Sequence, residues 1–114
     1  MILFTRAQFA LLLQNGEAYN ADPDFNPKPL VKLFNAIGSA TWLIASVDPN
    51  NPDFAFGLCD LGMGCPELGS VSIEELSNYK GSLNLGIERD LHWEANKTLS
   101  EYATEARQHR QIVA

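Results

Sequence analysis

The 114-residue sequence has no long apolar run. Its first two runs, residues 2–4 and 9–13, are interrupted by four residues that include Thr5, Arg6 and Gln8. A membrane-spanning helix needs about 20 apolar residues, and a signal peptide needs a longer uninterrupted core and a small-residue cleavage site. We therefore expect no membrane association and a cytoplasmic location.

Cysteine is scarce, with only Cys59 and Cys65 present. Two such residues in an intracellular chain are more typical of free thiols than of a disulfide. The pair lies six residues apart, which is not the spacing of a zinc knuckle or a redox motif, although His92 and His109 could complete a four-ligand zinc site. Cys59 lies in an apolar stretch, so we expect an inert, buried thiol.

The signatures of nucleophilic and nucleotide chemistry are also missing. The sequence has no Gly-x-Ser-x-Gly elbow, and neither cysteine has a neighbouring histidine. Its glycine-rich stretch, residues 57–69, contains Pro66 and leads into a strand, whereas a phosphate-binding loop leads into a helix. Trp42 and Trp93 lack surrounding basic residues, which favours core packing over base stacking. We expect no cofactor, and the pattern favours a binding protein over an enzyme.

Basic residues are few in the middle of the chain. Between residues 48 and 94 there are nine acids against Lys80 and Arg89, and the whole chain has a net charge of −6. This charge repels phosphate backbones, so we expect no direct nucleic-acid binding. It favours either a solvated surface or contact with a basic protein surface. The acids that we assign to partner binding are Asp48, Asp53, Glu74, Glu75, Glu88 and Asp90.

Three capping boxes mark the starts of three helices, at Thr5, Ser72 and Thr98. We expect the first helix over residues 6–15, ended by Gly16, and then a loop to residue 29. A two-turn helix should follow Ser72 and stop near residue 80. The last helix should bury an apolar stripe made by Leu99, Tyr102, Ala103 and Ala106.

The remaining chain predicts short strands joined by turns. We expect strands at residues 30–34, 40–47, 54–61, 67–71 and 85–93, with the middle three forming an antiparallel meander. Residues 40–47 are apolar at both alternating sets of positions, which is typical of a strand covered on both sides. The prediction is a single α+β domain, residues 1–114, with an antiparallel sheet of four to five strands. An N-terminal, a short middle and a C-terminal helix should pack on one face of this sheet.

Asp60 and Glu67 flank a glycine-rich turn. Paired carboxylates can bind Mg²⁺ or divide acid and base roles, but the glycines favour Asp60 as a cap for the backbone N–H groups of the turn. Arg89 lies among apolar neighbours on the predicted strand 85–93 and needs a carboxylate partner. The sequence therefore predicts a structural ion pair between Arg89 and either Asp60 or Glu67.

The alternative is a metal or acid–base cluster. On a strand, Glu88, Asp90 and His92 would share one face. Together with the turn carboxylates they would make a metal-dependent hydrolase or nuclease site from Asp60, Glu67, Glu88, Asp90 and His92.

Several stretches together resemble domain-of-unknown-function family 2958. They are residues 31–35, 40–43, 48–49, 56–64, 66–69 and 86–90, and the resemblance covers about residues 28–112. The most specific part is the GLCDLGMG sequence followed by PELG. Cys65 departs from the family pattern, which has an aromatic or other apolar residue there, and this weakens any zinc site that uses Cys65.

The resemblance implies small accessory proteins of plasmids, integrative elements and phages, often encoded near antirestriction domains. It supplies no catalytic residues. With the acidic middle segment, it favours a non-enzymatic protein that binds and inhibits a host defence protein (CRISPR or restriction) or a nucleic-acid-processing protein. A third possibility is a structural module of a larger assembly. The partner and the oligomeric state stay open.

Overall fold

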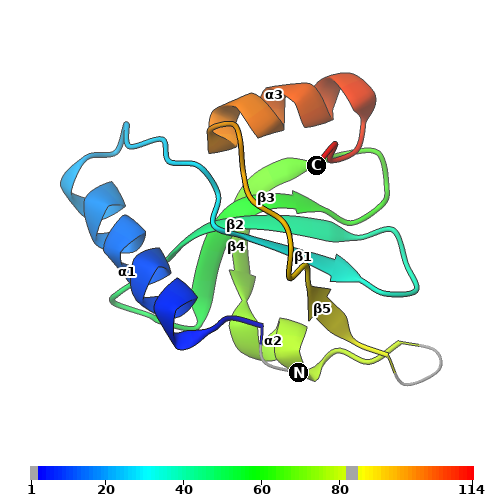
Figure 1. Ribbon diagram of the computed structural model, residues 1–114. Helices are drawn as coiled ribbons and strands as arrows, with labels where there is room; N and C mark the ends of the chain where they lie inside the picture. The colour runs from blue at the N-terminus through cyan, green and yellow to red at the C-terminus, as the bar shows by residue number, and fades with distance from the viewer. Residues whose placement is uncertain (1–2, 82–84) are drawn as a thin grey trace.

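A computed structural model describes residues 3–81 and 85–114 (Figure 1). Helices lie at both ends of the chain and between the last two strands. In chain order the elements are α1 (Arg6–Ala21), β1 (Val31–Asn35), β2 (Thr41–Val47), β3 (Phe54–Asp60), β4 (Glu67–Ser72), α2 (Ile73–Asn78), β5 (Ile87–Arg89) and α3 (Leu99–His109).

The five strands form one sheet in the order β4-β3-β2-β1-β5, and each neighbouring pair is antiparallel. The first four strands follow one another as a meander, because only short turns connect them. The chain then passes through α2 and returns at the far edge of the sheet, where β5 pairs with β1. The predicted α+β class and antiparallel sheet are confirmed. The ends of the first four strands agree with the predicted ends to within one residue.

The central strand β2 is buried on both faces. Trp42, Ile44 and Val47 belong to the core cluster under α1, whereas Leu43 and Ala45 belong to the cluster under α3. The register between β2 and β3 shifts at Ala45, which sets Val47 on the same side as Trp42. The prediction of helices on a single face is therefore wrong. Both faces of β2 are apolar, so each needs a cover, and Figure 1 shows α3 on one side of the sheet with α1 and α2 on the other.

Helix α1 begins at its predicted capping box, where Thr5 Oγ1 accepts a hydrogen bond from the Gln8 N–H at 3.0 Å. It does not end at Gly16 as predicted but continues to Ala21. Gly16 is buried against β2, where a Cβ atom would overlap the carbonyl oxygen of Val47. The glycine serves the close packing of helix on strand and not the end of the helix.

The predicted strand 85–93 is much shorter than expected, since β5 covers only Ile87–Arg89. Asp90 Oδ1 accepts a hydrogen bond from the His92 N–H at 3.0 Å and turns the chain away from the sheet. In the described part of the loop before β5, Lys80 and Gly86 form an isolated bridge. The last helix agrees with its prediction, with a complete capping box at Thr98 and a stripe of four buried residues, Leu99, Tyr102, Ala103 and Ala106.

Candidate interaction surface

Asp60 is a buried structural acceptor at the end of β3, with 3% of its surface exposed. Its Oδ1 accepts a hydrogen bond from the Gly62 N–H at 2.8 Å, and its Oδ2 accepts one from the Ile112 N–H at 2.9 Å. Gly62 and Gly64 have φ values of +80° and +81°, in the region that favours glycine. The predicted capping of the turn is confirmed. The bond to Ile112 was not predicted, because it joins residues 52 positions apart.

The sheet does not bring Arg89 to either of its predicted partners. Two strands, β2 and β1, lie between β3, which carries Asp60, and β5, which carries Arg89. Three strand spacings amount to about 14 Å. Arg89 also shares the face of Ile87, in the α1 cluster, whereas Asp60 shares the face of Leu58, in the α3 cluster.

Glu67 is separated from Arg89 by the full width of the sheet, since β4 and β5 are its two edges. The pairing inferred from sequence assumed that the strand of Arg89 lies beside the glycine-rich turn. The chain instead crosses through α2 and adds β5 next to β1. The structure therefore gives no support to the predicted ion pair.

The alternative metal site also fails to assemble. Its five residues were Asp60, Glu67, Glu88, Asp90 and His92. Both carboxylate oxygens of Asp60 accept hydrogen bonds from backbone N–H groups. Glu67 lies at the opposite edge of the sheet from Glu88. Asp90 and His92 form a turn and do not share one face of a strand. Within residues 3–81 and 85–114, no group of three His, Cys, Asp or Glu residues could hold a metal ion.

The six acids assigned to partner binding fall into separate places. Glu88 and Asp90 lie at the β5 edge, on or just after the strand. Asp48 is exposed in the turn between β2 and β3, where its Oδ1 accepts a hydrogen bond from the Asn50 N–H at 2.8 Å. The other three, Asp53, Glu74 and Glu75, gather at the start of α2.

Asp53 ties this acidic cluster together. Its Oδ2 accepts a hydrogen bond from the Ser72 hydroxyl at 2.6 Å, and its Oδ1 accepts one from the Glu74 N–H at 2.9 Å. The Ser72 hydroxyl in turn accepts a hydrogen bond from the Glu75 N–H at 3.2 Å, as the predicted N-cap of α2. The bond from Ser72, followed by that from Glu74, lowers the pKa of Asp53. Asp53 is therefore a carboxylate at neutral pH.

The cluster combines negative charge with aromatic surface. Asp53, Glu74 and Glu75 line a hollow of about 700 Å³ together with Phe54 and Tyr79. Both aromatic side chains are 44% exposed. Carboxylates in the first turn of a helix are favoured by its dipole, so the sequence places them there at little cost in stability.

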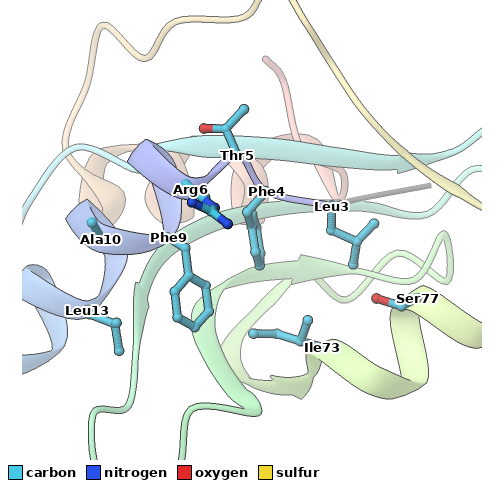
Figure 2. A pocket seen from close by; sticks show the side chains of 9 residues that line it. All are labelled: Leu3, Phe4, Thr5, Arg6, Phe9, Ala10, Leu13, Ile73 and Ser77. Atoms are coloured by element: carbon cyan, nitrogen blue, oxygen red, sulfur yellow. The ribbon is translucent and has the colours of Figure 1, made fainter.

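An apolar groove lies on the other side of α2, against the start of α1. Its volume is about 570 Å³, and most of its wall is hydrocarbon from Leu3, Phe4, Phe9, Leu13 and Ile73. Figure 2 shows Phe4, Phe9 and Ile73 around this groove, with Arg6 at its border. We call the acidic cluster, the two exposed aromatic residues and this groove the α2 surface. The groove has no signal in the sequence, because its walls come from segments about 65 residues apart.

The two cysteines differ in burial. Cys59 is half-buried, with its Sγ 3.9 Å from the Gly69 carbonyl oxygen, and burial raises its pKa to about 11. This agrees with the predicted inert thiol. Cys65 is exposed in the turn before β4. Trp42 is 5% exposed and belongs to the core, as predicted.

These features define an α+β protein built on a five-stranded antiparallel sheet, with acidic and apolar side chains gathered around a short helix. In the part of the chain that the structure describes, no helix is both long enough and apolar enough to cross a membrane. The sequence model of the family described as "Protein of unknown function (DUF2958)" matches residues 3–113, and the chain belongs to this family. No curated protein matches the chain, and no solved structure does.

Proposed function

We propose that this chain is a cytoplasmic, non-enzymatic binding protein that acts on a basic protein surface. The observation that carries the proposal is the convergence of Asp53, Glu74 and Glu75 beside the exposed rings of Phe54 and Tyr79. In the specific form of the proposal, the chain is an accessory protein of a mobile genetic element or phage. Its partner is a host defence protein (CRISPR or restriction) or a nucleic-acid-processing protein, which it inhibits.

The two kinds of side chain would have different roles in such a complex. Carboxylates at the rim raise the rate of association with a positively charged surface, and salt screens their effect. Aromatic side chains at the centre of an interface supply most of the apolar contact and slow dissociation. A surface that normally holds DNA or RNA has the positive charge that the acidic cluster complements. Inhibition then follows from occupancy of that surface.

The test is direct binding to purified candidate partners, such as CRISPR effector complexes and restriction enzymes. Binding is measured by biolayer interferometry at two salt concentrations. We expect binding at about 50 mM salt that weakens at least about tenfold at 300 mM. The double variant Glu74→Gln/Glu75→Gln should lower the association rate with little change in dissociation. Glu17→Gln/Glu94→Gln, at exposed positions on α1 and in the segment before α3, is the matched control for net charge. Failure of every candidate to bind at low salt would overturn the proposal.

A further inference from the structure

Several exposed apolar side chains belong to the connections at one end of the sheet, where the β1–β2 and β3–β4 connections lie on the right side of Figure 1. Ile37 lies between β1 and β2, Leu61 and Met63 lie between β3 and β4, and Tyr79 and Leu85 lie between α2 and β5. Their exposed fractions run from 43% for Leu85 to 74% for Met63. A gathering of this kind marks an interaction site more often than single exposed apolar residues do.

Contacts that involve side chains connect these segments. Gly62 packs so closely on Ser39 that a Cβ at position 62 would overlap the serine hydroxyl. Tyr79 accepts a hydrogen bond on its hydroxyl from Asn35 Nδ2 at 3.4 Å. Leu61 and Tyr79, from two different connections, therefore belong to one surface, and both line the same hollow.

A hollow of about 390 Å³ opens in this surface. Trp42, Leu76 and Ile87 contribute its apolar inner wall, and Leu61, Tyr79 and Glu75 contribute to its border. This volume lies near the lower end of the range of ligand pockets, about 300 to 1,000 Å³, and it is large enough for one large side chain. Glu75 and Tyr79 also line the hollow of the acidic cluster, so this hollow and the α2 surface are continuous.

Trp42 is one of the residues that line the hollow. Its indole Nε1 is buried and has no hydrogen-bond partner in the part of the chain that the structure describes. A buried donor without an acceptor is destabilising, and native proteins rarely keep one. Because Nε1 is buried, the indole N–H serves here as a reporter on the hollow and not as a donor to a bound segment.

We infer that this hollow is an anchor pocket for a polypeptide. It takes one aliphatic or aromatic side chain from an exposed segment of the partner, next to a lysine or arginine that pairs with Glu75. The inference rests on the proposed function, since it names what the protein partner inserts at the same surface. The apolar wall selects the anchor, and the Glu75 carboxylate selects the adjacent cation.

The test uses the intact protein, labelled with ¹⁵N, and a blocked tetrapeptide, acetyl-Gly-Leu-Arg-Gly-amide. Trp42 and Trp93 are the two tryptophans of the chain, so the indole N–H signals form an internal pair. Trp93 packs in the α3 cluster on the opposite face of the sheet. We expect the peptide to shift the Trp42 indole signal and leave the Trp93 signal in place, with a dissociation constant on the order of millimolar for so few contacts. Peptides with Glu for Arg, or Gly for Leu, should bind at least about threefold more weakly.

Two exposed leucines provide a matched pair of variants. Leu61→Ser, at the border of the pocket, should weaken the peptide about threefold or more. Leu91→Ser, after β5 and 67% exposed, should leave the affinity unchanged. Equal shifts for all peptides, or an unmoved Trp42 signal at saturation, would overturn the inference.

The two proposals can fail separately. If the defence proteins bind and Leu61→Ser has no effect on them or on the peptide, the anchor pocket is wrong and the proposed function stands. If the tetrapeptide binds as expected but no candidate partner is bound at low salt, the pocket stands and the proposed function fails.

Discussion

At the scale of single residues, the acids of this chain divide by burial. Asp60 is 3% exposed, and its two carboxylate oxygens accept hydrogen bonds from the backbone N–H groups of Gly62 and Ile112. Glu74 and Glu75 are exposed and leave their carboxylates in solvent. The same chemical group therefore stabilises the fold in one place and presents charge in another, and only its surroundings decide which.

We expect Asp60→Ala to destabilise the protein by about 2–4 kcal/mol, because two backbone donors lose a buried acceptor. The measurement is urea denaturation followed by circular dichroism. Asp48→Ala is the control, since Asp48 makes the same contact two residues ahead but in an exposed turn. Asp48→Ala should lower the free energy of unfolding by no more than about 1 kcal/mol. Equal losses in the two variants would contradict the structural role of Asp60.

At the scale of elements, two close contacts between residues far apart in the sequence position helices α1 and α2 against the sheet. Gly16 lets α1 approach β2 until the backbones touch at Val47. Asp53, in the turn before β3, accepts hydrogen bonds from the N-cap Ser72 and from Glu74 in α2, and thereby fixes that helix beside the β2–β3 turn. Each contact has a consequence that can be measured.

Gly16→Ala should destabilise the protein by about 1–3 kcal/mol, although alanine is the better helix former by about 1 kcal/mol. The added methyl group would overlap the Val47 carbonyl and force α1 away from β2. The measurement is the thermal unfolding of the variant and of the unsubstituted protein, from which the difference in the free energy of unfolding is obtained. Ala10→Gly, at an exposed position of the same helix, should cost only the propensity difference of about 1 kcal/mol. A stabilised Gly16→Ala variant would show that the close approach is not essential.

The pKa of Asp53, lowered by its bonds from Ser72 and Glu74, makes stability depend on pH. As the pH falls below about 4, the unfolded chain takes up this proton first, so the free energy of unfolding decreases through that window. Asp53→Asn has no proton to take up and should show a shallower decrease between about pH 5 and 3. Urea unfolding across this range measures both slopes. Parallel curves for the two proteins would rule out the contribution of Asp53.

At the scale of the whole molecule, β2 joins two core clusters that lie on opposite faces of one sheet. Trp42 and Ile44 serve the cluster under α1, while Leu43 and Ala45 serve the cluster under α3. Because the same strand supplies both, loss of one cluster should release the other. Asp60 adds a further link, since it fastens the segment after α3 to the end of β3.

We therefore expect the chain to unfold as a single domain, in one cooperative transition. Trp42 reports on the α1 face and Trp93 on the α3 face. In the variants Trp93→Phe and Trp42→Phe, the fluorescence of the remaining tryptophan and the circular dichroism should have the same urea midpoint within each variant. Two separated midpoints in either variant would show that the clusters unfold independently.

Much of the local structure could be predicted from the sequence. The capping boxes at Thr5 and Thr98, the turn at residues 48–53 and the double-sided apolar pattern of β2 each depend on neighbouring residues alone. Such features report short-range hydrogen bonding and periodicity, which a linear chain displays directly. The capping role of Asp60 is of the same kind, because its first partner lies two residues away.

The tertiary structure alone decided how these parts combine. Gly16 looked like a helix end, since nothing in its neighbours shows that β2 passes beside it. The predicted pairing of Arg89 with Asp60 or Glu67 gains no support from the strand order, because the position of β5 at the far edge depends on how the chain continues after α2. The acidic cluster and the anchor pocket likewise join residues from distant segments. The sequence thus determines elements whose energetics are local, while contacts across the sheet depend on the packing of every element at once.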